Sequence, residues 1–162
     1  MKINGVTVIN LQISNGLYSC DIVYDGHFLG HFKQSASYSD YFSFDRTVLE
    51  NSKEAFKKSE LYRISCFKTD GDINDFYTIS MFINDLCDLA LDEDILKKEI
   101  SKAGFYKLVI GESLITDETA YISISDESQY DYAEMLLKKH FNNSLLIRSY
   151  QSMEEFNFDL RK

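Results

Sequence analysis

The sequence predicts an α+β fold, in which an N-terminal antiparallel β-meander (about residues 3–45) is followed by a mixed half of helices and strands (about 46–162). Two observations predict this class. Strand-like stretches joined by tight-turn dipeptides cluster early in the chain, whereas helical and strand periodicities alternate later. The 162 residues contain no proline, no internal repeat and no linker-like segment, so we expect a single domain over 1–162.

The meander is defined by two turn dipeptides, Asn15-Gly16 and Asp25-Gly26, whose residues tolerate the positive φ angles of two-residue hairpin turns. Apolar and polar residues alternate on either side of these turns, as in strands with one buried face. Gly30 interrupts the third strand and indicates a bulge or close packing. The strands are expected at residues 6–13, 17–24, 27–33 and 41–45.

The second half is organised around a helix over residues 79–92. Its apolar residues recur at the i, i+3, i+4, i+7 spacing of an amphipathic helix, which needs a core on one side. On the helical wheel, Asp85, Asp88 and Asp92 fall together on the opposite side. Thr78 precedes the helix, where its hydroxyl can accept a hydrogen bond from a free backbone amide. The sequence therefore predicts a helix with one buried and one acidic face.

The remaining elements follow from shorter patterns. Asp92-Glu-Asp94 is expected to begin a second helix that reaches about Ala103, because carboxylates suit the positive end of a helix dipole. Gly104 is then the expected stop. Residues 61–67 fit either a strand or a helix. Further helices are expected at residues 47–58, at 128–141 with Ser128 as the cap, and from Ser152 onward with Glu155 in a capping box; strands at 105–110, 120–125 and 145–150; and a loop at 111–118.

The composition excludes several classes of partner. A net charge of −9 and a pI near 4.8 argue against direct binding to nucleic-acid phosphates or anionic membranes, since both need Lys and Arg. No apolar run is long enough to span a bilayer, and the first residues do not resemble a signal peptide. The chain has three cysteines, Cys20, Cys66 and Cys87, which are far apart in the sequence. An odd number of distant cysteines is typical of reduced thiols. We therefore expect a cytoplasmic protein.

No motif predicts a reaction. His27 and His31 have the spacing of helical zinc ligands, but four residues along a strand span roughly 13 Å, too far to share one metal. The stretch from Asp70 to Asn74 begins like a calcium loop and then lacks the required glycine and the final glutamate. We therefore expect a binding protein with no cofactor and no metal. An enzyme with a dispersed site around His27, His31 or His140 is the open alternative.

Two long stretches carry carboxylates but no Lys or Arg: residues 69–96, with eight Asp or Glu, and residues 108–137. One interpretation is a solvated surface that keeps the protein soluble. The functional interpretation is an anionic face that docks on a basic partner and mimics DNA, which carries one charge about every 1.7 Å along its axis. The candidate partner-binding residues are Met81, Asp85, Asp88, Asp92, Asp94, Glu112, Asp117, Glu118, Asp126 and Glu127.

A family resemblance rests on an early hairpin and on the later order of helix, two strands, helix and strand. Its segments are Tyr18-Ser-Cys20 through Tyr24-Asp25-Gly26-His-Phe-Leu-Gly30, Lys102-Ala-Gly104, and Lys138-Lys139-His-Phe141. They resemble small accessory proteins carried by phages and plasmids of bacteria. The resemblance implies an anti-CRISPR-like inhibitor, in the cytoplasm of a bacterial host cell, whose partner is a basic protein or ribonucleoprotein effector.

An immunity or antitoxin-like protein that neutralises a basic toxin makes the same demand on surface charge. Composition does not separate these two kinds of inhibitor, and the oligomeric state is equally open. Both readings share one expectation, which is an exposed acidic face on the helix over residues 79–92.

Overall fold

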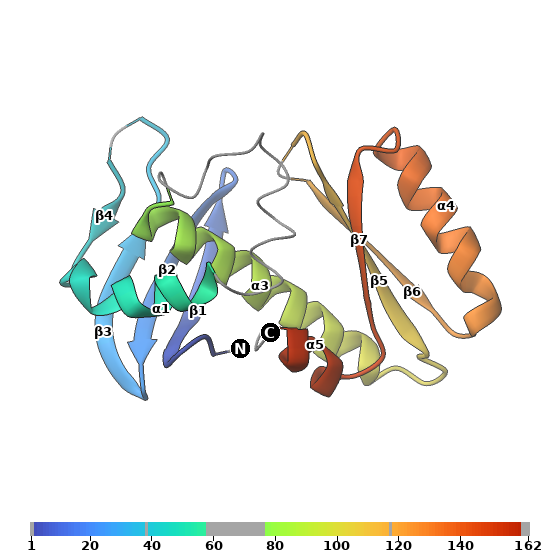
Figure 1. The fold of residues 1–162 in the computed structure, drawn as a ribbon, viewed down its shortest axis with the longest axis horizontal. Helices are drawn as coiled ribbons and strands as arrows, with labels where there is room; N and C mark the ends of the chain where they lie inside the picture. The colour runs from blue at the N-terminus through green and yellow to red at the C-terminus, as the bar shows by residue number, and fades with distance from the viewer. Residues whose placement is uncertain (1, 38, 58–76, 117, 160–162) are drawn as a thin grey trace.

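The predicted α+β fold is confirmed by the computed structural model, which describes residues 2–37, 39–57, 77–116 and 118–159. Two antiparallel sheets are connected by a long helix, α3 (Ile79–Ile100), which extends from the first sheet toward the second (Figure 1). Several expectations fall outside the described residues: the strand or helix at 61–67, the calcium-like stretch after Asp70, Cys66, and the candidate residue Asp117.

The first sheet, sheet A, is the predicted meander. Its strands pair in the order β1-β2-β3-β4, and their bounds are β1 (Val6–Ser14), β2 (Leu17–Tyr24), β3 (His27–Lys33) and β4 (Tyr41–Phe42). Both turn dipeptides adopt the expected positive φ, with 53° and 75° at Asn15-Gly16 and 47° and 86° at Asp25-Gly26. The hairpins therefore form as the dipeptides predicted.

Gly30 lies at a bulge, as its place in the strand predicted. The pairing between β2 and β3 shifts by one residue here, from Ile22 opposite Gly30 to Val23 opposite Phe28. Gly30 has φ +153°, and a Cβ atom added to it would lie 2.6 Å from Ser43 Oγ. The site therefore requires glycine both for its backbone angle and for the close approach of the next segment.

Replacing Gly30 with alanine is expected to lower the free energy of unfolding by about 1–3 kcal/mol, because the new methyl group collides with Ser43. Urea denaturation measures the loss. Gly16→Ala is the matched control, since Gly16 also has a positive φ but has no atom within 4 Å of the added Cβ. Equal losses in the two variants would contradict the close-packing explanation.

The helix α3 is longer than predicted. The structure has one continuous helix of 22 residues where the sequence predicted two, so the expected helix start at Asp92 is wrong. No glycine or proline interrupts residues 79–100, and Asp92 is instead a buried residue in mid-helix. The predicted cap is confirmed: the hydroxyl of Thr78 accepts from the backbone amide of Met81 at 3.2 Å. Gly104 follows the helix with φ +78°.

The second sheet, sheet B, consists of β5 (Lys107–Ser113), β6 (Thr119–Ile124) and β7 (Leu145–Tyr150), in the order β6-β5-β7. β5 lies in the centre and is antiparallel to both neighbours. The expected loop at 111–118 is therefore wrong for its first three residues. β5 continues because Gly111 packs under Leu137, where an added Cβ would lie 2.9 Å from Leu137 Cδ2.

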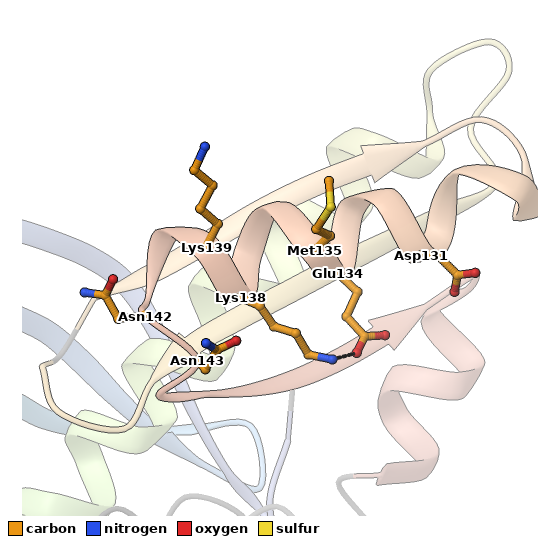
Figure 2. A pocket seen from close by; sticks show the side chains of 7 residues that line it. All are labelled: Asp131, Glu134, Met135, Lys138, Lys139, Asn142 and Asn143. Carbon is orange, nitrogen blue, oxygen red and sulfur yellow. Dashed lines mark ion pairs between the residues drawn. The ribbon is translucent and has the colours of Figure 1, made fainter.

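Helix α4 (Tyr130–His140) connects β6 to β7 and covers one face of sheet B (Figure 2). Its start differs from the prediction. The carboxylate of Asp126, rather than Ser128, is the cap: Asp126 Oδ1 accepts from the backbone amide of Ser128 at 2.8 Å, ahead of the 3-10 turn η3 (Glu127–Gln129). An aspartate two residues earlier reaches the free amides equally well, and its charge suits the dipole.

The described residues also include the short helical segments η1 (Arg46–Leu49), α1 (Glu50–Phe56) and α5 (Met153–Asp159). The predicted capping pair starts α5. The hydroxyl of Ser152 accepts from the backbone amide of Glu155 at 3.3 Å, and the Glu155 carboxylate accepts from the amide of Gln151 at 2.7 Å. The C-terminal helix is thereby held at the end of β7.

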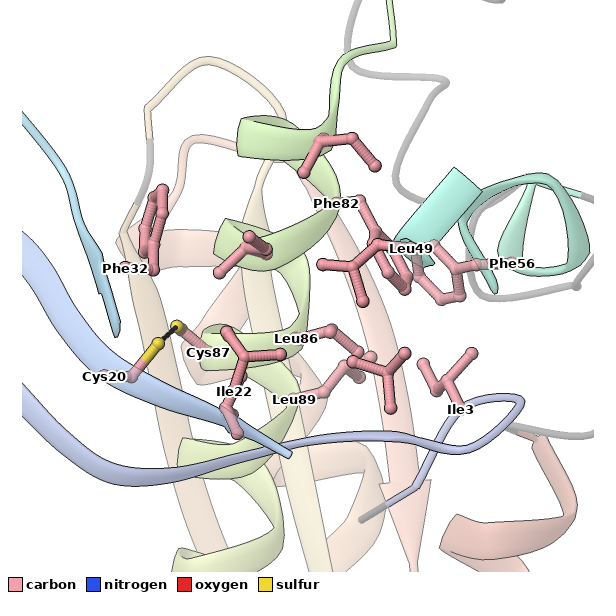
Figure 3. Close-up of a cluster of buried hydrophobic side chains, with 14 of the residues drawn as sticks. Ile3, Cys20, Ile22, Phe32, Leu49, Phe56, Phe82, Leu86, Cys87 and Leu89 are labelled. Carbon is pink, nitrogen blue, oxygen red and sulfur yellow. Dashed lines mark hydrogen bonds between the residues drawn. The ribbon is translucent and has the colours of Figure 1, made fainter. Parts of the chain in front are cut away.

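The larger core cluster lies around α3 and takes side chains from both sheets. Figure 3 shows the part of it in which Cys20 and Ile22 of sheet A lie beside Cys87 of α3. Val8 and Ile22 come from sheet A, and Leu108 and Ile110 come from sheet B. Cys20 and Cys87 are buried free thiols within it, with their sulfur atoms 3.7 Å apart. A smaller cluster lies between α4 and the other face of sheet B. α3 is thus the element against which both sheets pack.

Candidate functional site

The candidate partner-binding residues do not form one surface. In the described part of the chain, Met81, Asp88, Asp94, Glu118, Asp126 and Glu127 are exposed, Asp85 and Glu112 are partly buried, and Asp92 is buried. Glu118 precedes β6 and Asp126 follows it, so these two lie at opposite ends of that strand. The acidic residues therefore separate into three groups with different surroundings.

The first group is a polar cluster between α3 and sheet B. Asp92 of α3 is 3% exposed, and its Oδ2 lies 2.9 Å from Arg148 Nη2 of β7. The same guanidinium nitrogen lies 3.3 Å from Glu112 Oε2 of β5, and the Tyr121 hydroxyl of β6 donates to Asp92 Oδ1 at 2.7 Å. The prediction that Asp92 belongs to an exposed acidic face is therefore wrong, because a buried arginine binds it.

Two members of this cluster, Arg148 and Tyr121, have raised pKa values. Burial opposes the charge of Arg148, but the neighbouring Asp92 carboxylate, Tyr150 and Glu112 outweigh it and raise the Arg148 pKa. Burial, and then the Asp92 carboxylate, raise the pKa of Tyr121 well above its usual value. The arginine stays charged and the phenol stays neutral at physiological pH, so the cluster links α3 to all three strands of sheet B. We therefore interpret the cluster as a structural feature that holds α3 against sheet B.

The second group lies at the N-terminal part of α3 and consists of Met81, Asp85 and Asp88, which we call the α3 acidic edge. Met81 is 39% exposed and lies one turn before Asp85. The hydroxyl of Tyr77 donates to Asp85 Oδ2, and the hydroxyl of Tyr18 donates to Asp88 Oδ1. A hydroxyl group that donates to a carboxylate fixes the orientation of that carboxylate. The two aspartates are thus held in place on a rigid helix.

The third group surrounds sheet B, and its members have local partners. Glu118 Oε1 lies 2.8 Å from His140 Nε2, and Glu127 Oε2 lies 3.3 Å from Lys107 Nζ. Asp126 caps η3, and the hydrogen bonds from Ser128 lower its pKa. Glu118, Asp126 and Glu127 of the second lysine- and arginine-free stretch therefore act in a separate cap and separate ion pairs. Asp94 is exposed on α3 and belongs to none of the three groups.

The three histidines lie on two elements. His27 and His31 belong to β3, whereas His140 ends α4. His31 Nδ1 contacts Asp21 Oδ1, and Asn10 Nδ2 donates to Asp21 Oδ2 at 2.7 Å; these three residues line a hollow on sheet A. Chiefly this Asn10 hydrogen bond lowers the pKa of Asp21.

The hollow does not assemble a catalytic site from the side chains that the structure describes. Within that part of the chain, no serine, threonine or cysteine side chain is hydrogen-bonded to the imidazole of His31, and no group of three His, Cys, Asp or Glu could hold a metal ion. A histidine held by a carboxylate is one part of a nucleophilic site, which also needs the nucleophile within hydrogen-bond reach. The α3 acidic edge remains the best-ordered candidate for contact with a partner.

Comparison of the chain with protein-family models, curated proteins and solved structures finds no match. Over the described residues, none of the helices has the length and apolar character needed to cross a membrane.

Proposed function

We propose that this chain is a binding protein that inhibits a nucleic-acid-handling complex of bacterial defence, and that its α3 acidic edge occupies a basic channel of that complex. The observation that carries the proposal is the pair Asp85 and Asp88, each fixed by a tyrosine hydroxyl on one side of α3. Fixed carboxylates lose little conformational freedom on binding, which favours affinity. Met81 adds an apolar contact beside them.

Electrostatics support the same proposal. The chain carries a net charge of −9, so its overall field attracts a basic partner and repels nucleic acid. Charge complementarity speeds the encounter and sets the orientation, and both effects weaken as salt screens the charges. An inhibitor of this kind competes with nucleic acid for a basic channel and has no need of a catalytic group.

The double variant Asp85→Asn/Asp88→Asn is expected to fold normally and to bind the effector at least about tenfold more weakly, because close charge pairs across an interface each couple by more than about 1.5 kcal/mol. Asparagine keeps an acceptor for each tyrosine, so stability should change by less than about 0.5 kcal/mol per site. The measurement is binding to purified basic effector complexes, including Cas effectors, at low and high salt.

Glu54→Gln/Glu154→Gln is the matched control, because it removes two exposed carboxylates from α1 and α5 and leaves α3 untouched. This control should bind like the natural chain. Equal weakening of both double variants would show that only net charge matters, and the α3 acidic edge would lose its role. Absence of binding to every basic effector, at low salt, would overturn the inhibitor proposal altogether.

A further inference from the structure

The outer face of α4 exposes large apolar side chains. Tyr132 is 61% exposed, Met135 is 53% exposed and Leu136 is 37% exposed, while Ala133 and Leu137 on the inner face are buried against sheet B. Because α4 has only 11 residues, three such side chains form a dense apolar strip on it. Exposed apolar strips with a polar border are typical of interaction surfaces.

The charges along the same face are sorted by sign. Asp131 lies in the first turn of α4, and Lys138 and Lys139 lie in the last. Figure 2 shows Met135 and Lys139 pointing to one side of the helix, while Glu134 and Lys138 form an ion pair on another side. One end of the outer face is therefore acidic and the other end is basic, with apolar side chains between them.

We propose that two copies of this chain associate through their α4 helices, packed antiparallel about a twofold axis beside Met135. Residues 131 and 139 lie four positions on either side of 135, so the axis brings Asp131 of each copy to the level of Lys139 of the other, within reach of the long lysine side chain. A twofold interface uses the same patch on both copies and must therefore be self-complementary. The acidic and basic ends of α4 meet this requirement.

The same geometry pairs the apolar residues and the remaining charges. A twofold axis between antiparallel helices brings each flank of one helix against the same flank of the other, so Leu136 meets Leu136 and Tyr132 of the second copy. On the other flank, Glu134 approaches Lys138 of the second copy. The dipoles of the two antiparallel helices point in opposite directions, and their interaction stabilises the dimer.

A second copy fits this surface better than a uniformly charged partner. A partner surface with only basic groups would be repelled by Lys138 and Lys139, and one with only acidic groups would be repelled by Asp131. Contact through one short helix buries an area at the low end of specific interfaces, below about 1,200 Å², so the association should be reversible. It is independent of the α3 acidic edge, and neither proposal requires the other.

The test is a pair of charge reversals, Asp131→Lys and Lys139→Asp, studied by sedimentation equilibrium over roughly 1 µM to 1 mM, the range that covers weak specific interfaces. The natural chain should dimerise. Each single reversal places like charges opposite each other at both symmetric contacts, so its dimer dissociation constant should rise at least about tenfold. Circular dichroism verifies that each variant is folded.

Mixing the two variants provides the decisive result. In a mixed dimer, the lysines of Asp131→Lys meet the aspartates of Lys139→Asp at both contacts, so the mixture should dimerise again. The double reversal Asp131→Lys/Lys139→Asp should also dimerise by itself. Asp94→Lys and Lys98→Asp reverse an exposed pair of opposite charges on α3 and should leave the dissociation constant unchanged.

Met135→Lys gives an independent check, because it places two like charges at the axis and should weaken the dimer even if a reversal near a helix end disturbs folding. A natural chain that stays monomeric over the whole range would overturn the proposal. So would single reversals without effect, or a mixture that does not associate.

Discussion

Replacing Arg148 with methionine is expected to lower the free energy of unfolding by about 3–5 kcal/mol, because it leaves two carboxylates without their cation. Asp92 is 3% exposed and Glu112 is also mostly shielded from water, and both contact the same guanidinium nitrogen of Arg148. Methionine fills much of the volume but cannot offset the buried charge. The attachment of α3 to sheet B should weaken with it.

Urea denaturation followed by circular dichroism measures this loss. Arg46→Met is the matched control, since Arg46 is exposed and stacks over the ring of Phe42, 4.9 Å from its centroid. Its loss should stay near 1 kcal/mol or below, as for an exposed cation–π contact, roughly 0.5–1 kcal/mol. Equal losses for the two arginines would show that the polar cluster stabilises the fold no more than an exposed cation–π contact does.

Removing the whole cluster should cost less than removing its cation alone. The triple variant Asp92→Leu/Glu112→Gln/Arg148→Met replaces the buried charges with neutral side chains, and such replacements are often neutral or stabilising by about 1–4 kcal/mol relative to the ion pair. A triple variant less stable than Arg148→Met would contradict the explanation by uncompensated charge.

Local signals in the sequence were enough to predict sheet A. Asn15-Gly16 and Asp25-Gly26 each determine a hairpin through backbone angles that few other residues adopt, and these turns fix the register of the strands around them. Thr78 likewise caps α3 with its own hydroxyl. Such features depend on a few neighbouring residues, so one sequence suffices to find them.

The candidate site was harder to predict because the surroundings of α3 change along its length. Its N-terminal half packs against sheet A, whereas Asp92 contacts sheet B through Arg148 and Tyr121. A single helical wheel assumes one buried direction for the whole helix, and so it placed Asp92 with Asp85 and Asp88. The available clue was Arg148, a cation within an apolar strand, which requires a buried carboxylate from elsewhere in the chain.

The interpretation of the acidic stretch over residues 108–137 also changes once its fold is known. Two of its carboxylates, Glu118 and Glu127, lie near opposite ends of β6 and pair with His140 and Lys107. Those partners come from outside the stretch, so a run without Lys or Arg does not predict a surface without cations. The α3 acidic edge rests on a more local feature, because Asp85 and Asp88 are about one helical turn apart, a spacing that the sequence itself determines.

Phe82→Ala is expected to destabilise the protein by about 3–5 kcal/mol, the range for removing a fully buried aromatic ring. Phe82 is 0% exposed, and its ring centroid lies 5.8 Å from that of Phe56 of α1, beside Leu49 and Leu86 (Figure 3). The cavity would open where α3 meets α1. The α3 acidic edge is on the same helix but does not include Phe82. The measured partner binding should therefore fall only in proportion to the fraction of unfolded protein.

Met81→Ala is the control for Phe82→Ala, because Met81 is the adjacent residue on α3 but is 39% exposed. Thermal and urea unfolding should show a loss below about 1 kcal/mol for Met81→Ala, as for most surface changes. A double-mutant cycle with Phe56→Ala should return a coupling of about 0.5–1.5 kcal/mol, the additional energy of an aromatic pair. Losses of equal size at Met81 and Phe82 would mean that this part of α3 does not pack into the core. The α3 acidic edge would then lose its support, because Phe82 lies three residues before Asp85 and anchors this part of α3 in the core.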